Sequence, residues 1–117
     1  MKKIALITCL LFAAPTYADP PIVEDIRLEQ SGVSWSVSVT LRHEDTGWDD
    51  YADGWRIETA DGTILGHRVL VHPHVDEQPF TRSLHTLMLP EDQTKFFVRP
   101  RDLIGGWSEQ RFEFQKP

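Results

Sequence analysis

Two histidines, His72 and His74, stand one residue apart in an irregular stretch that also contains Asp76 and Glu77. In an extended segment, side chains two positions apart point to the same side, so both imidazoles can face one ligand. Imidazole and carboxylate groups are ligands for zinc, nickel and copper ions. With His43 as a further ligand from another loop, these residues predict a divalent-metal site. The proline between the histidines can splay them, and loop capping with surface hydrogen bonding is the alternative role.

A second polar stretch carries five carboxylates in ten residues: Glu44, Asp45, Asp49, Asp50 and Asp53. Calcium takes about six to eight oxygen ligands, often from such loops, so a calcium site is one interpretation. The spacing does not follow the EF-hand loop. Aspartate is also common in turns because its side chain bonds nearby backbone N–H groups, and this is the other interpretation.

Aromatic residues accompany these polar stretches: Trp48, Tyr51 and Trp107, with Asp49 and Asp53 close to the first two along the chain. Aromatic rings with acids at their rim suit the stacking of a sugar, a peptide or a cationic group. These five residues therefore predict a binding platform. The alternative is that the rings are lids over the end of a core.

Sequence signatures of catalysis are absent from the printed chain. It has no Gly-x-Ser-x-Gly elbow, no His-Glu-x-x-His helix and no phosphate-binding glycine loop. Ser83 and His85 lie two residues apart on a predicted strand, but no third group orients them. We therefore expect a protein without enzymatic activity and without a cofactor, apart from the metal ion of the alternative above.

The elements that must position these residues are predicted to be β-strands. From Val33 to Arg42, apolar residues alternate with hydroxylic or charged ones, the pattern of a half-buried strand. Further strands are predicted over residues 22–30, 55–59, 63–71, 80–89, 94–101 and 108–114, with Gly66 as a candidate bulge. Seven short strands and no helical period predict an all-β, two-sheet antiparallel sandwich, with Trp35 and Trp55 in its core.

The connections between these strands alternate in character. Short turns at residues 31–32, 60–62 and 90–93 alternate with elaborate loops at residues 43–54, 72–79 and 102–107. Successive connections of an antiparallel sandwich lie at opposite ends, so the three elaborate loops are predicted to share one end. Binding loops commonly cluster at one end of such folds.

Part of the chain resembles known domains. Leu89-Pro90, Thr94-x-Phe96-x-Val98 and Gly105-Gly106-Trp107-Ser108 resemble the last two strands of fibronectin type III and related immunoglobulin-like domains, over about a quarter of the chain. The resemblance implies an immunoglobulin-like sandwich of about seven strands, with Phe96 nearest the place of the usual corner tyrosine, and it implies no function. Asp45-Thr46-Gly47-Trp48-Asp49 and His72-Pro73-His74 resemble strings in small, uncharacterised secreted bacterial proteins, which supply no catalytic residues.

The beginning of the chain has the three parts of a secretory signal. Two lysines precede an apolar run from Ile4 to Ala14, and a small-residue site ends at Ala18. The run is shorter than the roughly 20 apolar residues that a membrane-spanning helix needs. We therefore expect residues 1–18 to be removed and residues 19–117 to form the domain, in the periplasm or outside the cell. Cys9 lies in the apolar run without a lipobox, so the expected mature chain has no disulfide or thiol chemistry.

The formal charge is −6, and removal of Lys2 and Lys3 makes it more negative. Such a surface disfavours nucleic acid and anionic lipid, and no membrane insertion is expected after signal removal. The leading interpretation is a non-enzymatic binding or accessory module whose three loops meet a protein, peptide or glycan. The alternatives are a periplasmic metal-binding protein that uses His72 and His74, and a structural sandwich subunit that associates through its edge strands.

Overall fold

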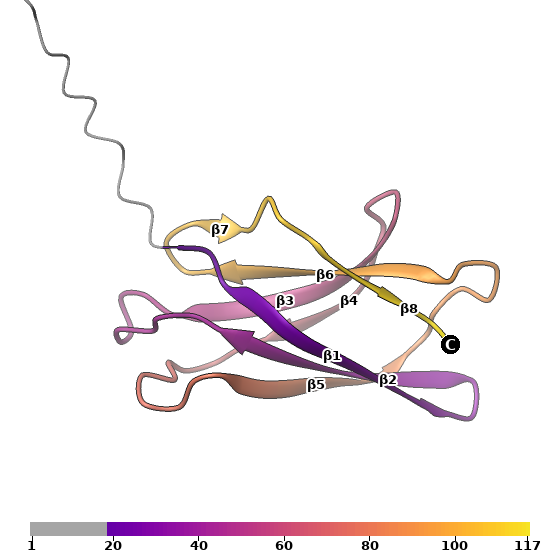
Figure 1. Cartoon of the computed structure of the whole chain (residues 1–117), viewed down its shortest axis with the longest axis horizontal. Coiled ribbons are helices and arrows are strands. Elements are labelled where there is room, and N and C mark those ends of the chain that lie inside the picture. Colours follow the sequence, from indigo (N-terminus) through magenta and orange to yellow (C-terminus); the bar gives the residue numbers. More distant parts are fainter. Residues whose placement is uncertain (1–18) are drawn as a thin grey trace, which may run out of the picture.

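The computed structural model describes residues 19–117, and these residues form eight β-strands and no helix (Figure 1). The predicted signal sequence and Cys9 lie outside the described residues. The strands form two antiparallel sheets that pack as a β-sandwich, which confirms the predicted all-β fold class. Their bounds are β1 Ile22–Ser31, β2 Ser34–Arg42, β3 Ala52–Thr59, β4 Ile64–Val69, β5 Phe80–Leu87, β6 Lys95–Asp102, β7 Gly106–Trp107 and β8 Phe112–Gln115.

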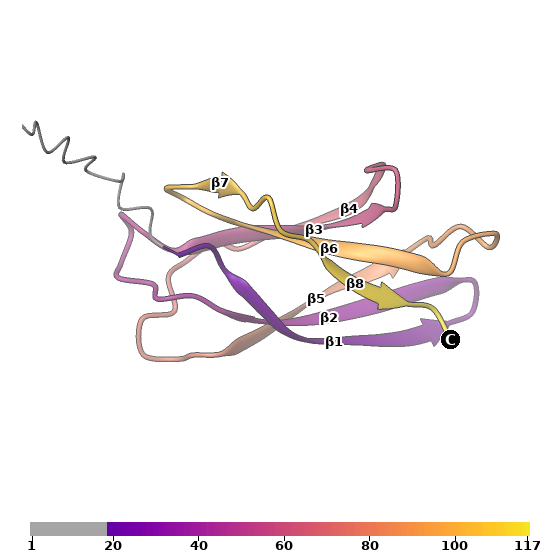
Figure 2. The same ribbon diagram turned by 45° about the horizontal axis from the view of Figure 1, so that its top comes forward.

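The first sheet has the strand order β1-β2-β5, and the second has the order β4-β3-β6. Both β7 and β8 pair with β6, at successive positions along it. Figure 2 shows the two sheets as separate layers, with β3, β4 and β6 above β1, β2 and β5. Every named strand pair is antiparallel, so consecutive connections lie at opposite ends of the sandwich.

Alternation along β2 builds half of the core. Its side chains switch between buried and half-buried at every residue because successive side chains of a strand point to opposite faces. Trp55 of β3 is fully buried opposite, and Trp35 is 8% exposed, so both predicted core tryptophans are confirmed. The buried apolar cluster also includes Val37, Val39, Leu41, Ile57, Phe96 and Val98.

A glycine allows the two sheets to approach each other at one side. Gly66 lies in β4 opposite Ile57, and the β3–β4 register shifts just beyond it, which confirms the predicted irregularity there. A methyl group on Gly66 would lie 2.6 Å from Leu84 Cδ2 and 2.8 Å from Leu87 Cδ1 of β5. The missing side chain is therefore what lets the edge strands β4 and β5 pack closely.

The predicted last strand over residues 108–114 is confirmed only in its second half, as β8. The end of the chain pairs with β6 in two short segments, β7 against Arg101 and Asp102 and β8 against residues 95–98. Pro100 lies in the gap between them and has no N–H to donate to a ladder. Arg99 then donates to the carbonyl oxygens of Ser108 and Glu109, which takes these groups away from strand pairing.

Candidate functional site

The three elaborate loops meet at one end of the sandwich, as their alternation along the chain predicted. We call this end the loop pole and define it by residues 43–51, 70–79 and 103–105, the connections that the structure shows between the strands. In Figure 1 the three loops lie together at the left, opposite the short turns. The predicted bounds were too wide at two places, because β3 begins at Ala52 and β7 takes up residues 106–107.

A buried carboxylate joins two of these loops. The Asp45 side chain is 0% exposed. Its Oδ1 accepts hydrogen bonds from the Ala52 backbone N–H at 3.0 Å and from His43 Nδ1 at 2.6 Å, and its Oδ2 accepts one from the His74 backbone N–H at 2.8 Å. Asp45 therefore satisfies three donors on buried residues, and it fixes residues 43–51 against residues 70–79.

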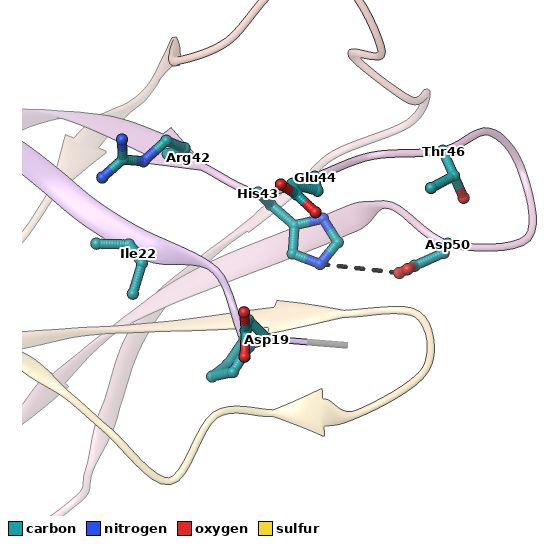
Figure 3. A pocket seen from close by; sticks show the side chains of 8 residues that line it. Asp19, Ile22, Arg42, His43, Glu44, Thr46 and Asp50 are labelled. Carbon is teal, nitrogen blue, oxygen red and sulfur yellow. Dashed lines mark ion pairs between the residues drawn. The ribbon is translucent and has the colours of Figure 1, made fainter. Parts of the chain in front are cut away.

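His43 extends this network to the third loop. Its side chain is 2% exposed, and its Nε2 lies 3.6 Å from Asp102 Oδ2. The same nitrogen lies 3.8 Å from Asp50 Oδ1 (Figure 3). Asp102 Oδ1 in turn accepts a hydrogen bond from the Gly105 backbone N–H. One imidazole thus lies among three carboxylates, two from the first loop and one from the end of β6, where the three loops converge.

The predicted metal ligands are only partly brought together. The rings of His72 and His74 lie 4.5 Å apart, so the two histidines do converge. His74 is buried and stacks on Phe80 at 4.0 Å, and its backbone rather than its ring contacts the Asp45 carboxylate. Asp76 and Glu77 are exposed. Residues 19–117 contain no group of three or more side chains arranged to hold a metal ion.

Burial controls the charge of His74. Desolvation lowers the pKa of its imidazole, and the positive charge of Arg82 and the neighbouring His72 lower it further. Glu77 and Asp45 act in the opposite direction without reversing the shift. His74 is therefore held in its neutral form, which suits a ring stacked on Phe80.

The predicted aromatic platform is divided between two places. Trp48 is 67% exposed and lies edge-on to Tyr51, with the ring centroids 5.7 Å apart. Trp107 lies on the outer face of the second sheet, where its ring meets Arg56 at 4.1 Å and Arg101 at 5.2 Å. The loop pole thus presents the Trp48–Tyr51 pair, and Trp107 belongs to an arginine-lined sheet face.

The two acids predicted to rim that platform also have different surroundings. Asp49 is exposed beside Trp48. Asp53 accepts a hydrogen bond from Arg101 Nε at 2.8 Å and is tied to the sheet face that holds Trp107. Asp49 is therefore free to meet a ligand at the loop pole, and Asp53 is engaged within the chain.

Exposed apolar side chains gather at the loop pole. Ten large apolar residues are exposed in the described chain, and seven of them lie in its loops or at the adjoining strand ends. Those seven are Ile22, Trp48, Val69, Val71, Val75, Leu103 and Ile104. The exposed acids Glu44, Asp49, Asp76 and Glu77 lie among them. Apolar surface of this kind, rimmed by charge, is typical of a protein interaction site.

Sequence reasoning missed a further buried carboxylate, Glu58 in β3. It is 1% exposed and pairs with Arg99 Nε at 2.7 Å, Arg56 Nε at 2.6 Å and Arg111 Nη1 at 3.4 Å. Burial alone would raise the pKa of Glu58, but hydrogen bonds and charge from Arg99 and Arg56 outweigh it and hold the pKa below its usual value. The alternation of β3 places Arg56 and Glu58 on one face, and this was the available signal.

Comparison with known proteins finds a relative, a protein of Halomicrobium mukohataei described as "Putative lipoprotein". This chain is 44% identical to it over 89 residues. The matched stretch is 75% of this chain and 43% of the relative, so this chain spans less than half of the relative's length. No family model and no solved structure matches. Among residues 19–117, no helix is long and apolar enough to cross a membrane.

Proposed function

We propose that this chain is an exported, non-enzymatic binding module that holds a partner protein at its loop pole. The single observation that carries the proposal is the gathering of seven exposed apolar side chains at one end of the sandwich. Apolar area exposed to water is unfavourable unless a partner covers it. The opposite end has only Val33, Ile64 and Met88 in this class.

The chemistry of the loop pole indicates the kind of partner. Four exposed acids, Glu44, Asp49, Asp76 and Glu77, accompany the apolar side chains. Arg42, the nearest exposed cation at the end of β2, is already paired with Glu24 at 2.9 Å. A protein segment that offers both apolar and basic side chains therefore matches this surface best, because complementary charge favours encounter and fixes orientation.

Location in the cell envelope is part of the same proposal. The charged, apolar and small-residue parts of residues 1–18 are those of an export signal. The description of the Halomicrobium relative as a lipoprotein supports an envelope location for this chain as well. Within the envelope, a small sandwich with a fixed loop pole is suited to an accessory role beside a larger protein.

The strand order supports the finer fold assignment. A three-stranded sheet of β1, β2 and β5 faces a sheet of β4, β3 and β6 extended by β7 and β8. Two such antiparallel sheets, with loops clustered at the ends, are the architecture of immunoglobulin-like domains. We propose that the chain is immunoglobulin-like on this ground.

A labelled synthetic peptide of alternating leucine and lysine, titrated with the purified protein and followed by fluorescence anisotropy, tests the binding proposal. Trp48→Ser combined with Ile104→Ser should weaken binding by at least about tenfold, because exposed anchors of this kind dominate interface energies. Val33→Ser, a matched change at the opposite end where Val33 is 80% exposed, should leave the affinity unchanged. Equal affinities for the natural protein, the double variant and Val33→Ser would refute a binding role for the loop pole.

A further inference from the structure

An acidic hollow of about 340 Å³ lies where the first described residues meet the first loop of the pole. Its wall includes the carboxylates of Asp19, Glu44 and Asp50 and the imidazole of His43 (Figure 3). The one cation in the lining, Arg42, is paired with Glu24. The hollow is therefore a small, electronegative space beside the convergence point of the three loops.

One buried acceptor at this hollow has no donor. His43 Nδ1 bonds Asp45 Oδ1, and this directs Nε2 of the same ring toward Asp50 and Asp102. Nε2 makes no hydrogen bond with any residue of the described chain, although the His43 side chain is only 2% exposed. Asp50 Oδ1, 3.8 Å away, is buried and likewise without a partner among residues 19–117.

A buried carboxylate oxygen without a donor is costly, and in an acidic hollow it calls for a ligand that supplies both N–H groups and positive charge. A primary ammonium supplies three donors and one charge in a small volume. A guanidinium instead presents a flat fork that matches a single carboxylate held in one plane, whereas three carboxylates line this hollow.

The chain itself carries such a group at this place once it is processed. Hydrolysis of the Ala18–Asp19 peptide bond by the peptidase that removes export signals consumes one water molecule. It leaves a carboxylate on Ala18 and an α-ammonium on Asp19. Asp19 lines the hollow, and Pro21, two residues further, is fully buried. Two successive prolines restrict the backbone, so the new ammonium is held near His43 and Asp50 at low entropic cost.

We propose that the hollow binds the α-ammonium of Asp19, so that removal of the signal fastens the start of β1 to the loop pole. This inference rests on the export half of the proposed function and does not depend on partner binding. The mature N-terminus then supplies the donor that Asp50 Oδ1 lacks.

The test compares two exported proteins. One is the natural chain, and the other has Gly-Ser inserted between Ala18 and Asp19, so that the same cleavage leaves the ammonium two residues away. Mass spectrometry of each product first establishes the new N-terminus, and cleavage elsewhere would refute the export step on which the inference rests. With cleavage after Ala18, we expect the extended protein to have a Tm about 4–8 °C lower at pH 6.5.

Asp50→Asn made in both proteins is the matched control. The Tm difference should shrink by at least half in this background, and it should persist in the Asp49→Asn background because Asp49 is exposed. The difference should also vanish above about pH 9, where an α-ammonium has lost its proton. If Asp50→Asn does not fold, acetylation of the Asp19 amine replaces it and should lower the Tm of the natural product alone.

Two results would overturn the inference. One is an equal Tm for the natural and extended proteins at pH 6.5. The other is a Tm difference that Asp50→Asn leaves unchanged. Binding of free n-butylamine to the natural mature protein, with loss of that binding in Asp50→Asn, would also overturn it, because it would show an empty hollow that awaits a lysine from a partner.

Discussion

Replacement of Asp45 by alanine removes the acceptor that joins two loops of the pole. Three donors lose their partner: the backbone N–H groups of Ala52 and His74 and the Nδ1–H of His43. Each buried donor left unsatisfied costs about 1–3 kcal/mol, so the expected loss in the free energy of unfolding for the three donors is about 3–9 kcal/mol. Domains of this size are stabilised by about 5–15 kcal/mol in total, so the loss is a large fraction of the stability.

Urea unfolding followed by circular dichroism measures this loss from the midpoint and slope of the transition. Asp45→Asn should have roughly half the effect, because the amide keeps one acceptor oxygen and turns its NH₂ group toward a donor. The matched control is Asp49→Ala, an exposed neighbour, which should change the stability by less than about 0.5 kcal/mol. A loss below about 1 kcal/mol for Asp45→Ala would refute the view that this carboxylate organises the loops.

Three further changes give distinct outcomes. Glu58→Gln should lower the free energy of unfolding in urea by about 2–3 kcal/mol. Since the pKa of Glu58 is lowered, the stability that its charge supplies above about pH 4.5 is lost as pH falls through its folded-state pKa. A free energy of unfolding that stays constant in acid would contradict this. The pKa of His74 is lowered mainly by burial, so stability should fall as pH drops below about 6.5. His74→Phe should flatten that part of the plot of Tm against pH. An unchanged slope in this variant would exclude His74 as the source of the pH dependence. Gly66→Ala should cost about 1–3 kcal/mol because its methyl group meets Leu84 and Leu87, and a stabilised variant would show that the packing there is looser.

Much of the fold was predictable because strand alternation is a local property of the sequence. The buried face of β2 follows directly from its period of two. Apolar and polar residues occur on both faces of the strand predicted over residues 80–89, so the sequence leaves the phase of β5 ambiguous, and the structure explains why. The β2–β5 register shifts between Trp35 and Val37, and Thr86 on the opposite strand has φ = 59°. This bulge changes which face the next residues occupy, and threonine gives no sequence signal for a left-handed backbone.

The loop pole was predictable for the same kind of reason, since antiparallel strands place alternate connections at the same end. The contacts within it were not. Whether Asp45 points to solvent or inward depends on the turn geometry of residues 43–51, and composition alone does not reveal this. The predicted loop over residues 102–107 includes Trp107, so the sequence predicts this residue at the pole. In the structure Trp107 belongs to β7, and pairing with Arg101 turns its side chain to the sheet face.

The central claim is that the loop pole is the binding surface, and mapping of amide chemical shifts tests it most directly. The natural mature protein, labelled with nitrogen-15, is titrated with the leucine–lysine peptide, and the shift of every amide is followed. Binding at the loop pole predicts shifts confined to residues 43–51, 70–79 and 103–105 and their adjoining strand ends, with the amide shifts of the turns at residues 32–33 and 60–63 unchanged. Shifts concentrated at those turns, or along the edge strand β1, would contradict it.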